Sequence, residues 1–321
     1  MTKKLLLPVL MTFALLLQAS VAQSVTISVS QFVEHPALDA ILQGFQDYLK
    51  EKGIDVKYNV HNAQANMGTA MQIAQQMVGE KPDLLVAITT VSAQTCAQAL
   101  SKAPAYLKRP LLFSGVTDPV AAGLVKNLQK PTGGITGVAD LLPVREHLKM
   151  VLQYYPGIKT LGLLYNAGEI NSKATIASVR ALAPEMGLKI VEATASKTAD
   201  VYQAALSLVG RVDAVFIPTD NTIISALESV LKVGVQNKLP IFAADIDSVK
   251  RGAVAAMGFD YYKHGYQTGA LAEKIINGMA PEDIPVEFQK DLQLYINANY
   301  SKQMGLTPPD ALLKQATQVY Q

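Results

Sequence analysis

Short apolar or β-branched segments alternate with amphipathic segments along this chain. Residues 25–30 alternate in polarity, which predicts a strand, and residues 36–49 then carry apolar side chains at the 3.6-residue period of a helix. Residues 54–60, 65–78 and 83–88 continue the pattern as strand, helix and strand, the last of them almost continuously apolar. A strand of that kind is typical of a parallel sheet covered on both faces. The alternation therefore predicts a doubly wound parallel sheet with right-handed crossovers.

The same order of segments occurs twice. Three pairs of segments match in order, at offsets of 130, 130 and 134 residues: 82–89 with 212–219, 110–113 with 240–243, and 53–56 with 187–190. Each copy reads as alternating strands and helices, and no single match would be persuasive by itself. We therefore expect an α/β fold of two similar doubly wound lobes, joined near residues 137–143.

The first residues have the pattern of an export signal. Two lysines precede an uncharged run over residues 5–17, and small residues follow at Ser20 and Ala22. A basic start, an apolar run and small residues predict a secretory signal peptide over residues 1–22. A membrane anchor would need about 20 apolar residues, and no Cys follows the run to carry a lipid. We expect a soluble protein in the periplasm.

Charge and motifs exclude several classes of function. The chain has 28 Lys and Arg against 26 Asp and Glu, and two of the lysines belong to the predicted signal. Nucleic-acid binding needs a basic stripe, so we expect no nucleic-acid partner. The sequence contains no Gly-x-Ser-x-Gly, His-Glu-x-x-His or Gly-x-x-x-x-Gly-Lys motif, and its four histidines do not pair at metal-ligand spacing. We expect no catalytic residue, no metal and no cofactor.

The residues that follow each predicted strand are the candidate ligand-binding residues, because open parallel sheets bind ligands beyond the carboxyl ends of their strands. The first block supplies mostly hydroxyls and the second supplies carboxylates. This asymmetry suits a zwitterion, whose carboxylate takes hydroxyls and helix N-termini while its ammonium takes an aspartate, with Asp220 and Asp245 as the strongest candidates. The candidates are Phe32, Glu34, Thr89, Thr90, Ser92, Ser114, Thr117, Asp118, Tyr165, Asn166, Thr219, Asp220, Asn221, Asp245 and Tyr262.

The alternative for each candidate is an ordinary structural role. Ser, Thr, Asp and Asn at these places are often N-caps of the following helix. His35, directly after the first strand, is the one histidine that could touch a ligand. The single Cys96 cannot form an internal disulfide and has no basic neighbour in sequence to activate it.

Five strings carry a family resemblance over nearly the whole mature chain. They are Gln31-Phe-Val-Glu-His-Pro-Ala-Leu-Asp39, Val116-Thr-Asp-Pro-Val-Ala-Ala-Gly-Leu-Val125, Leu164-Tyr-Asn166, Ile217-Pro-Thr-Asp-Asn-Thr222 and Gly258-Phe-Asp-Tyr-Tyr262. In these strings the chain resembles bacterial ABC-transporter substrate-binding proteins of the tryptophan/tyrosine importer type. The resemblance implies a periplasmic-binding-protein type I fold with three hinge crossings, an aromatic or apolar amino acid as ligand, and an ABC permease of the inner membrane as partner.

The resemblance also favours particular residues. Matching the strings position by position favours Thr117 with Asp118, then Asn166, and then residues 219–221. Where the family has Ala-Thr-Pro-Ala-Ala after the third strand, this chain has Thr89-Thr90-Val91-Ser92-Ala93. The added hydroxyls could reshape the side-chain pocket.

A division into lobes follows from the expected crossings. Residues 23–139 plus about 262–288 would form the N-terminal lobe, and residues 140–261 plus about 289–321 the C-terminal lobe. We expect a monomer that captures its ligand by hinge closure. The alternatives are a binding protein for a sugar, purine or short peptide, a secreted α/β enzyme, and the sensor domain of a repressor.

Overall fold

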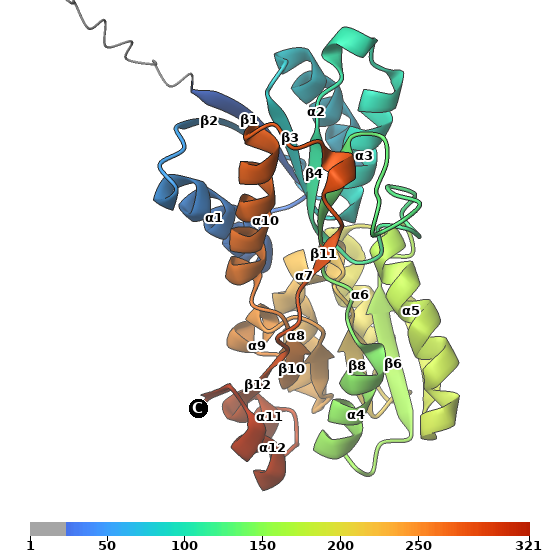
Figure 1. The fold of residues 1–321 in the computed structure, drawn as a ribbon. Helices are drawn as coiled ribbons and strands as arrows, with labels where there is room; N and C mark the ends of the chain where they lie inside the picture. Colours follow the sequence, from blue (N-terminus) through green and yellow to red (C-terminus); the bar gives the residue numbers. More distant parts are fainter. Residues whose placement is uncertain (1–23) are drawn as a thin grey trace, which may run out of the picture.

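Two lobes lie end to end in the computed structural model, which describes residues 24–321 (Figure 1). The predicted signal peptide, residues 1–22, lies outside this part of the chain. Each lobe is one β-sheet flanked by helices, and each has its own hydrophobic core. No helix within residues 24–321 combines the length and apolar character that crossing a bilayer requires.

The N-terminal lobe contains a six-stranded sheet that is parallel throughout. Its strands are β1 (Val25–Gln31), β2 (Val56–Asn62), β3 (Leu84–Ile88), β4 (Leu111–Val116), β5 (Ile135–Ala139) and β11 (Glu287–Phe288). Their order is β11-β5-β4-β3-β1-β2. Its helices are α1 (Pro36–Glu51), α2 (Met67–Glu80), α3 (Thr90–Lys102) and α10 (Tyr261–Ile276), with short 3-10 turns η1 (Ala105–Leu107) and η4 (Pro281–Asp283).

The C-terminal lobe contains a seven-stranded sheet. Its strands are β6 (Thr160–Tyr165), β7 (Lys189–Thr194), β8 (Ala214–Ile217), β9 (Ile241–Ala243), β10 (Ala255–Gly258), β12 (Gln293–Asn297) and β13 (Gln318–Tyr320), in the order β13-β12-β10-β9-β8-β6-β7. Its helices are α4 (Val144–Tyr154), α5 (Ile170–Leu182), α6 (Val201–Leu206), α7 (Asn221–Ser225), α8 (Leu227–Asn237), α9 (Asp247–Arg251), α11 (Ala298–Gln303) and α12 (Asp310–Gln315), with 3-10 turns η2 (Pro184–Met186) and η3 (Thr198–Asp200).

The two sheets repeat the same strand order. In the N-terminal lobe β4-β3-β1-β2 are neighbours, and β9-β8-β6-β7 occupy the equivalent places in the C-terminal lobe. The turns before β2 and β7 are also alike, since Gly53 (φ +70°) and Gly187 (φ +76°) both adopt a left-handed conformation that glycine tolerates. The expectation of two similar doubly wound α/β lobes is confirmed.

One strand departs from the parallel pattern. β12 pairs antiparallel with β10, and β13 then pairs parallel with β12. The chain leaves β10 at the end of the sheet nearest the other lobe, passes through α10 and β11, and returns to the same end. β12 therefore starts where β10 stops, and it has to run the opposite way.

The chain passes between the lobes at three places. Residues 140–143 join β5 to α4, residues 259–260 join β10 to α10, and residues 289–292 join β11 to β12 (Figure 1). The junction expected near residues 137–143 coincides with the first of these crossings, and their number agrees with the three crossings that the family resemblance implies. The other two come from the last part of the chain, whose placement periodicity alone could not decide.

Helix α10 packs against α1 with almost no side chains between the two backbones. A Cβ atom added at Gly265 would lie 1.9 Å from the Ile41 carbonyl oxygen, and one added at Gly44 would lie 2.0 Å from the Tyr262 carbonyl oxygen. These backbone atoms cannot move aside without separating the helices. This close approach fixes α10, which directly follows the second crossing, to the N-terminal lobe.

We expect Gly265→Ala to lower the free energy of unfolding by about 3 kcal/mol, because it overpacks a backbone contact. The matched control is Gly79→Ala in the last turn of α2, where an added Cβ meets nothing within 4 Å. That control should raise the free energy of unfolding by up to about 1 kcal/mol through helix propensity. Urea unfolding followed by circular dichroism measures both, and equal effects would contradict the close-packing argument.

Candidate functional site

A narrow cavity lies where the two lobes meet. The space open to the centre of a water-sized sphere measures only about 30 Å³. The lobes are therefore close together around the cavity. Both lobes and the first crossing contribute to its wall. The lining residues are His35, Ala37, Leu38, Thr89, Thr90, Gly115, Thr117, Asp140, Asn171, Thr219, Asn221, Asp245 and Tyr261.

The wall is built from strand ends and helix starts. His35 precedes α1, and Thr89 separates β3 from α3 in the N-terminal lobe. In the C-terminal lobe, Asn171 and Asn221 stand in the first turns of α5 and α7, and Asp245 lies between β9 and α9. Parallel strands place these connections at the carboxyl ends of the strands in each sheet, where such folds bind ligands. The strand ends of the two sheets face each other across the cavity.

Four buried polar atoms in this wall have no hydrogen-bond partner. They are His35 Nδ1, Thr90 Oγ1, Asp140 Oδ1 and Asn171 Oδ1, and all four side chains line the cavity. Buried polar groups are nearly always paired in folded proteins, and an unpaired one costs about 1–3 kcal/mol. Their convergence on one space between the lobes marks it as a place where a polar ligand can complete the hydrogen bonding.

Asp140 is the carboxylate in the wall with a free oxygen. It lies in the first crossing, is 3% exposed, and accepts a hydrogen bond at Oδ2 from Tyr261 Oη, 3.0 Å away. Burial raises the pKa of Asp140, while the Tyr261 and Thr117 hydroxyls lower it. An ammonium group placed in the cavity would supply the missing donor at Oδ1 and favour the charged carboxylate.

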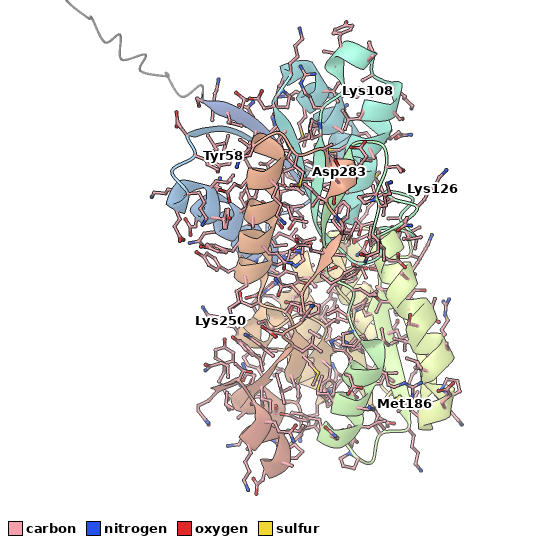
Figure 2. The ribbon with its side chains drawn as sticks, viewed as in Figure 1. Tyr58, Lys108, Lys126, Met186, Lys250 and Asp283 are labelled. Carbon is pink, nitrogen blue, oxygen red and sulfur yellow. The ribbon has the colours of Figure 1, made fainter. Side chains whose placement is uncertain are left out.

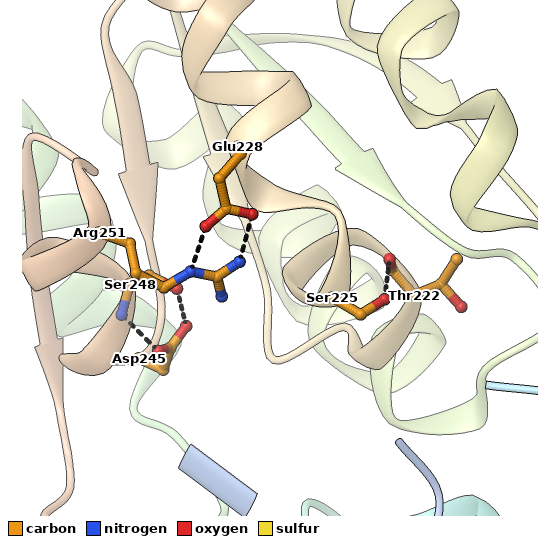
Figure 3. A network of polar contacts seen from close by, with 6 residues as sticks. All are labelled: Thr222, Ser225, Glu228, Asp245, Ser248 and Arg251. Carbon is orange, nitrogen blue, oxygen red and sulfur yellow. Dashed lines mark hydrogen bonds and ion pairs between the residues drawn. The ribbon is translucent and has the colours of Figure 1, made fainter. Parts of the chain in front are cut away.

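Asp245 is the second carboxylate in the wall, and its oxygens already have partners. Oδ1 accepts from the Ser248 N–H at 2.8 Å and Oδ2 from the Ser248 hydroxyl at 2.7 Å, beside the ion pair of Arg251 with Glu228 (Figure 3). Burial raises the pKa of Asp245, and the hydrogen bonds from Ser248 and the charge of Arg251 lower it. Asp245 therefore stabilises the start of α9 and also adds negative charge to the wall.

The start of α3 has a strained backbone. Thr89 adopts φ +91° and ψ 160°, a region populated almost only by glycine, and its hydroxyl accepts a hydrogen bond from the Ser92 N–H. This conformation turns the first residues of α3 toward the cavity, where both Thr89 and Thr90 line the wall. The first N–H groups of a helix have no intrahelical partner and attract anions. Across the gap, the Thr117 and Thr219 hydroxyls are 3.5 Å apart.

The charged side chains of the wall are acidic. Among residues 24–321, no Lys or Arg lines the cavity. Lysines such as Lys108 and Lys126 are exposed and project from the outer edge of the N-terminal lobe (Figure 2). His35 stays neutral near pH 7, because burial and the charge of Arg251 lower its pKa to about 4. Two carboxylates without a lining cation favour a ligand that carries an amine.

The structure brings six of the predicted residues to the cavity wall: Thr89, Thr90, Thr117, Thr219, Asn221 and Asp245. The other nine lie elsewhere, and most of them hold partners within their own lobe. Asn166 and Asp220 are joined to each other, since Asp220 Oδ2 accepts from the Asn166 N–H at 2.6 Å. Hydrogen bonds of this kind, made within one lobe, hold the side chains away from the cavity.

Asp220 belongs to a buried network of the C-terminal lobe. Its Oδ2 also accepts from the Ser172 hydroxyl at 2.6 Å, and its Oδ1 caps α7 through the Ile223 N–H at 2.9 Å. The neighbouring Glu169 accepts from the backbone and side chains of Asn221 and Thr222. Burial and the nearby charge of Glu169 raise the pKa of Asp220. Both oxygens of Asp220 are thus engaged away from the cavity.

The remaining predicted residues have structural partners or face solvent. Phe32 is in the core of the N-terminal lobe, and Glu34 is exposed. The polar ones bond to residues outside the cavity wall or close to them in sequence: Ser92 with Ser30, Ser114 with Thr268, Asp118 with the N–H groups of Val120 and Ala121, Tyr165 with Glu192, and Tyr262 with Asp47.

Three polar residues of the wall were not among the sequence candidates: Asp140, Asn171 and Tyr261. Asp140 follows directly after the strand over 135–139, so the rule that ligands bind beyond strand ends could have identified it. Tyr261 rather than Tyr262 faces the cavity, a choice that depends on the rotation of α10. His35, which the sequence offered only as able to touch a ligand, lines the wall.

Comparisons with known proteins add an independent line of evidence. A family model described as ABC transporter substrate binding protein matches residues 26–320. A tyrosine-binding protein of Clostridioides difficile (strain R20291) is 39% identical over 284 residues, which cover 87% of this chain and 81% of that protein.

Two solved structures of similar sequence identity differ in how closely their overall structures match. A domain from Streptococcus pneumonia in complex with L-Trp is 33% identical, with a TM-score of 0.86 over 91% of this chain and 99% of that chain. The ligand-free, open structure of a substrate binding protein with adhesive properties from Clostridium difficile is 36% identical, yet its TM-score is 0.67 over 92% of this chain and 99% of that chain. The overall structure here is therefore more similar to the L-Trp complex than to the open structure.

Proposed function

The chain belongs to the family of ABC transporter substrate binding proteins, and we propose that it captures a free aromatic amino acid between its lobes. The membership confirms the family resemblance of its sequence strings. A substrate binding protein of this family delivers a small ligand to a transporter permease, so a permease is the implied partner. The family is one of binding proteins rather than enzymes, and we propose that capture involves no chemical step.

The observation that carries the proposal is the set of unpartnered polar atoms in the cavity wall. Asp140 Oδ1 would accept from the ligand ammonium, with Asp245 adding negative charge nearby. The Thr90 hydroxyl and the start of α3 would donate to the ligand carboxylate. A zwitterion has the two opposite charges that these two sides of the wall require.

The side chain of the ligand would meet a mixed surface. Ala37, Leu38 and the ring of Tyr261 offer apolar contact, while Asn171 offers an unpartnered acceptor, Oδ1, and His35 an unpartnered ring nitrogen, Nδ1. An aromatic ring that also carries a donor, as tyrosine and tryptophan do, suits this surface. The relatives described as binding tyrosine and L-Trp support the same ligand class.

Capture would proceed by closure. The ligand touches residues of both lobes, so only the closed arrangement gains both sets of contacts, and ligand binding shifts the population toward it. The crossings at residues 140–143, 259–260 and 289–292 would absorb the rotation. The two lobes on either side of these crossings would be the mobile units. We propose a periplasmic monomer, exported by a cleaved signal peptide.

A panel of tyrosine analogues tests the zwitterion assignment. We expect L-tyrosine or L-tryptophan to bind in isothermal titration calorimetry at pH 7.5. Tyramine lacks the carboxylate and 3-(4-hydroxyphenyl)propanoate lacks the amino group, and each should bind at least about a hundredfold more weakly, because each leaves one charged or polar side of the wall unpaired.

Two further ligands serve as controls. D-Glucose should not bind, and L-phenylalanine should bind more weakly than L-tyrosine, since it has no donor for Asn171 Oδ1. Tight binding of a sugar, a purine or a peptide, with no aromatic amino acid bound, would replace the proposed ligand class. Native mass spectrometry of protein purified from cells would show any retained ligand by its mass.

A further inference from the structure

Tyr261 links the start of α10 to the first crossing between the lobes through one hydrogen bond. It is the first residue of α10, directly after the crossing at residues 259–260, and its side chain is 5% exposed. Its Oη donates to Asp140 Oδ2 at 3.0 Å, and Asp140 belongs to the crossing at residues 140–143. Both residues line the cavity. The bond occupies one oxygen of Asp140 and leaves the other, Oδ1, unpartnered.

Tyr261 can act only as a donor toward Asp140. Burial and the charges of Asp140, Asp245 and Asp247 all raise the pKa of Tyr261 well above its ordinary value, so the phenol keeps its proton. A hydrogen bond donated to a carboxylate stabilises the charged form. The bond therefore lowers the pKa of Asp140 and opposes the effect of burial, which raises it.

The other titratable groups around this pair come from several elements. His35 stands before α1 and His264 on α10, and burial lowers the pKa of each to about 4, so both are neutral above pH 5. Asp245 and Asp247 lie at the start of α9, and burial together with the charges of Asp245 and Asp260 raises the pKa of Asp247 to about 7.

Arg251, at the end of α9, is the nearby cation, and its charge acts on Asp245, Asp247 and His35. Replacing Tyr261 by Phe changes no charge, so the direct electrostatic effect of each of these groups on Asp140 is the same in both proteins.

We infer that Tyr261 is a positioning residue, which holds Asp140 ionised and turned so that its free Oδ1 receives the amino group of the ligand. This inference rests on the proposed function, in which Asp140 receives that group. Without the Tyr261 hydroxyl, a carboxyl group this deeply buried would take up a proton at a higher pH, and it would lose its fixed orientation. Because the bond joins the first crossing to the start of α10, directly after the second crossing, it also holds Asp140 in place where the lobes rotate.

The test compares Tyr261→Phe with the wild-type protein by calorimetry with L-tyrosine from pH 5 to pH 8. Affinity should fall on acidification as Asp140 becomes protonated, and the midpoint of that fall should lie about one pH unit higher in Tyr261→Phe. The matched control is Tyr266→Phe. Tyr266 lies on the same helix and also donates to a carboxylate, Glu51, at 2.7 Å, but neither residue lines the cavity. This control should leave the pH profile unchanged.

A loss of affinity that is equal at every pH, or no loss at all, would overturn the positioning role, because packing alone would give either result. Titration of the Asp140 carboxyl carbon by nuclear magnetic resonance, assigned with Asp140→Asn, gives a second readout without ligand. A higher pKa of Asp140 in Tyr261→Phe would support the inference, and an unchanged pKa would reject it. Wild-type protein that binds no aromatic amino acid would instead reject the proposed function, and the carboxyl titration would still decide the effect of Tyr261 on Asp140.

Discussion

Asp140→Asn should weaken the binding of L-tyrosine by more than about a hundredfold. The substitution removes the charge that faces the ligand ammonium inside a closed cavity, and truncating one partner of a buried charge pair costs about 2–5 kcal/mol. Asparagine has nearly the same shape and keeps an oxygen that can accept from Tyr261. Calorimetry measures the affinity, and thermal unfolding checks that the fold is retained.

An exposed aspartate provides the control for a change of net charge. Asp55 lies between α1 and β2, at the opposite end of the strands from the cavity, so Asp55→Asn should leave the affinity within about twofold. Measuring two ligands on both proteins tests whether Asp140 contacts the amino group itself. Asp140→Asn should hardly change the weak binding of 3-(4-hydroxyphenyl)propanoate, which has no amino group. Equal losses for both ligands would show that Asp140 acts on the cavity as a whole and does not receive the ammonium.

Asp220→Ala should lower the free energy of unfolding by about 3–5 kcal/mol. The substitution leaves three buried donors without an acceptor: the Asn166 N–H, the Ser172 hydroxyl and the Ile223 N–H. Relief of the repulsion between Asp220 and Glu169 offsets only part of this loss. Urea unfolding measures the change, which should be located in the C-terminal lobe.

The comparison variant is Asn66→Ala, which removes an exposed N-cap of α2 with one hydrogen bond, to the Thr69 N–H at 3.0 Å. That change should lower the free energy of unfolding by about 1 kcal/mol. The larger loss expected for Asp220→Ala would then come from the buried network and not from helix capping alone. An Asp220→Ala protein with unchanged stability and no ligand binding would place Asp220 at the ligand, as the residue pattern alone predicted.

The two carboxylates illustrate how far sequence reasoning reaches into the site. Asp220 and Asp140 both follow a strand, so both satisfy the rule that ligands bind beyond strand ends. Only the folded structure shows that Asp220 has partners at both oxygens while Asp140 Oδ1 has none. Which acceptor stays free depends on the donors that other segments bring to it, and those donors are distant in sequence.

The sequence by itself determined the two doubly wound lobes and the polar residues that follow their strands, because hydrophobic periodicity and strand ends are local properties of the chain. The sequence also predicted that Thr89, Thr90, Thr117 and Thr219 belong to the ligand site, and all four line the cavity wall. Only the tertiary structure decided that Tyr261 rather than Tyr262 faces that wall, that β12 runs antiparallel, and that Asp140 carries the free oxygen. The physical reason is that the rotation of α10, the direction of β12 and the partners of Asp140 are all set where segments from the two lobes meet, and local patterning does not specify those contacts.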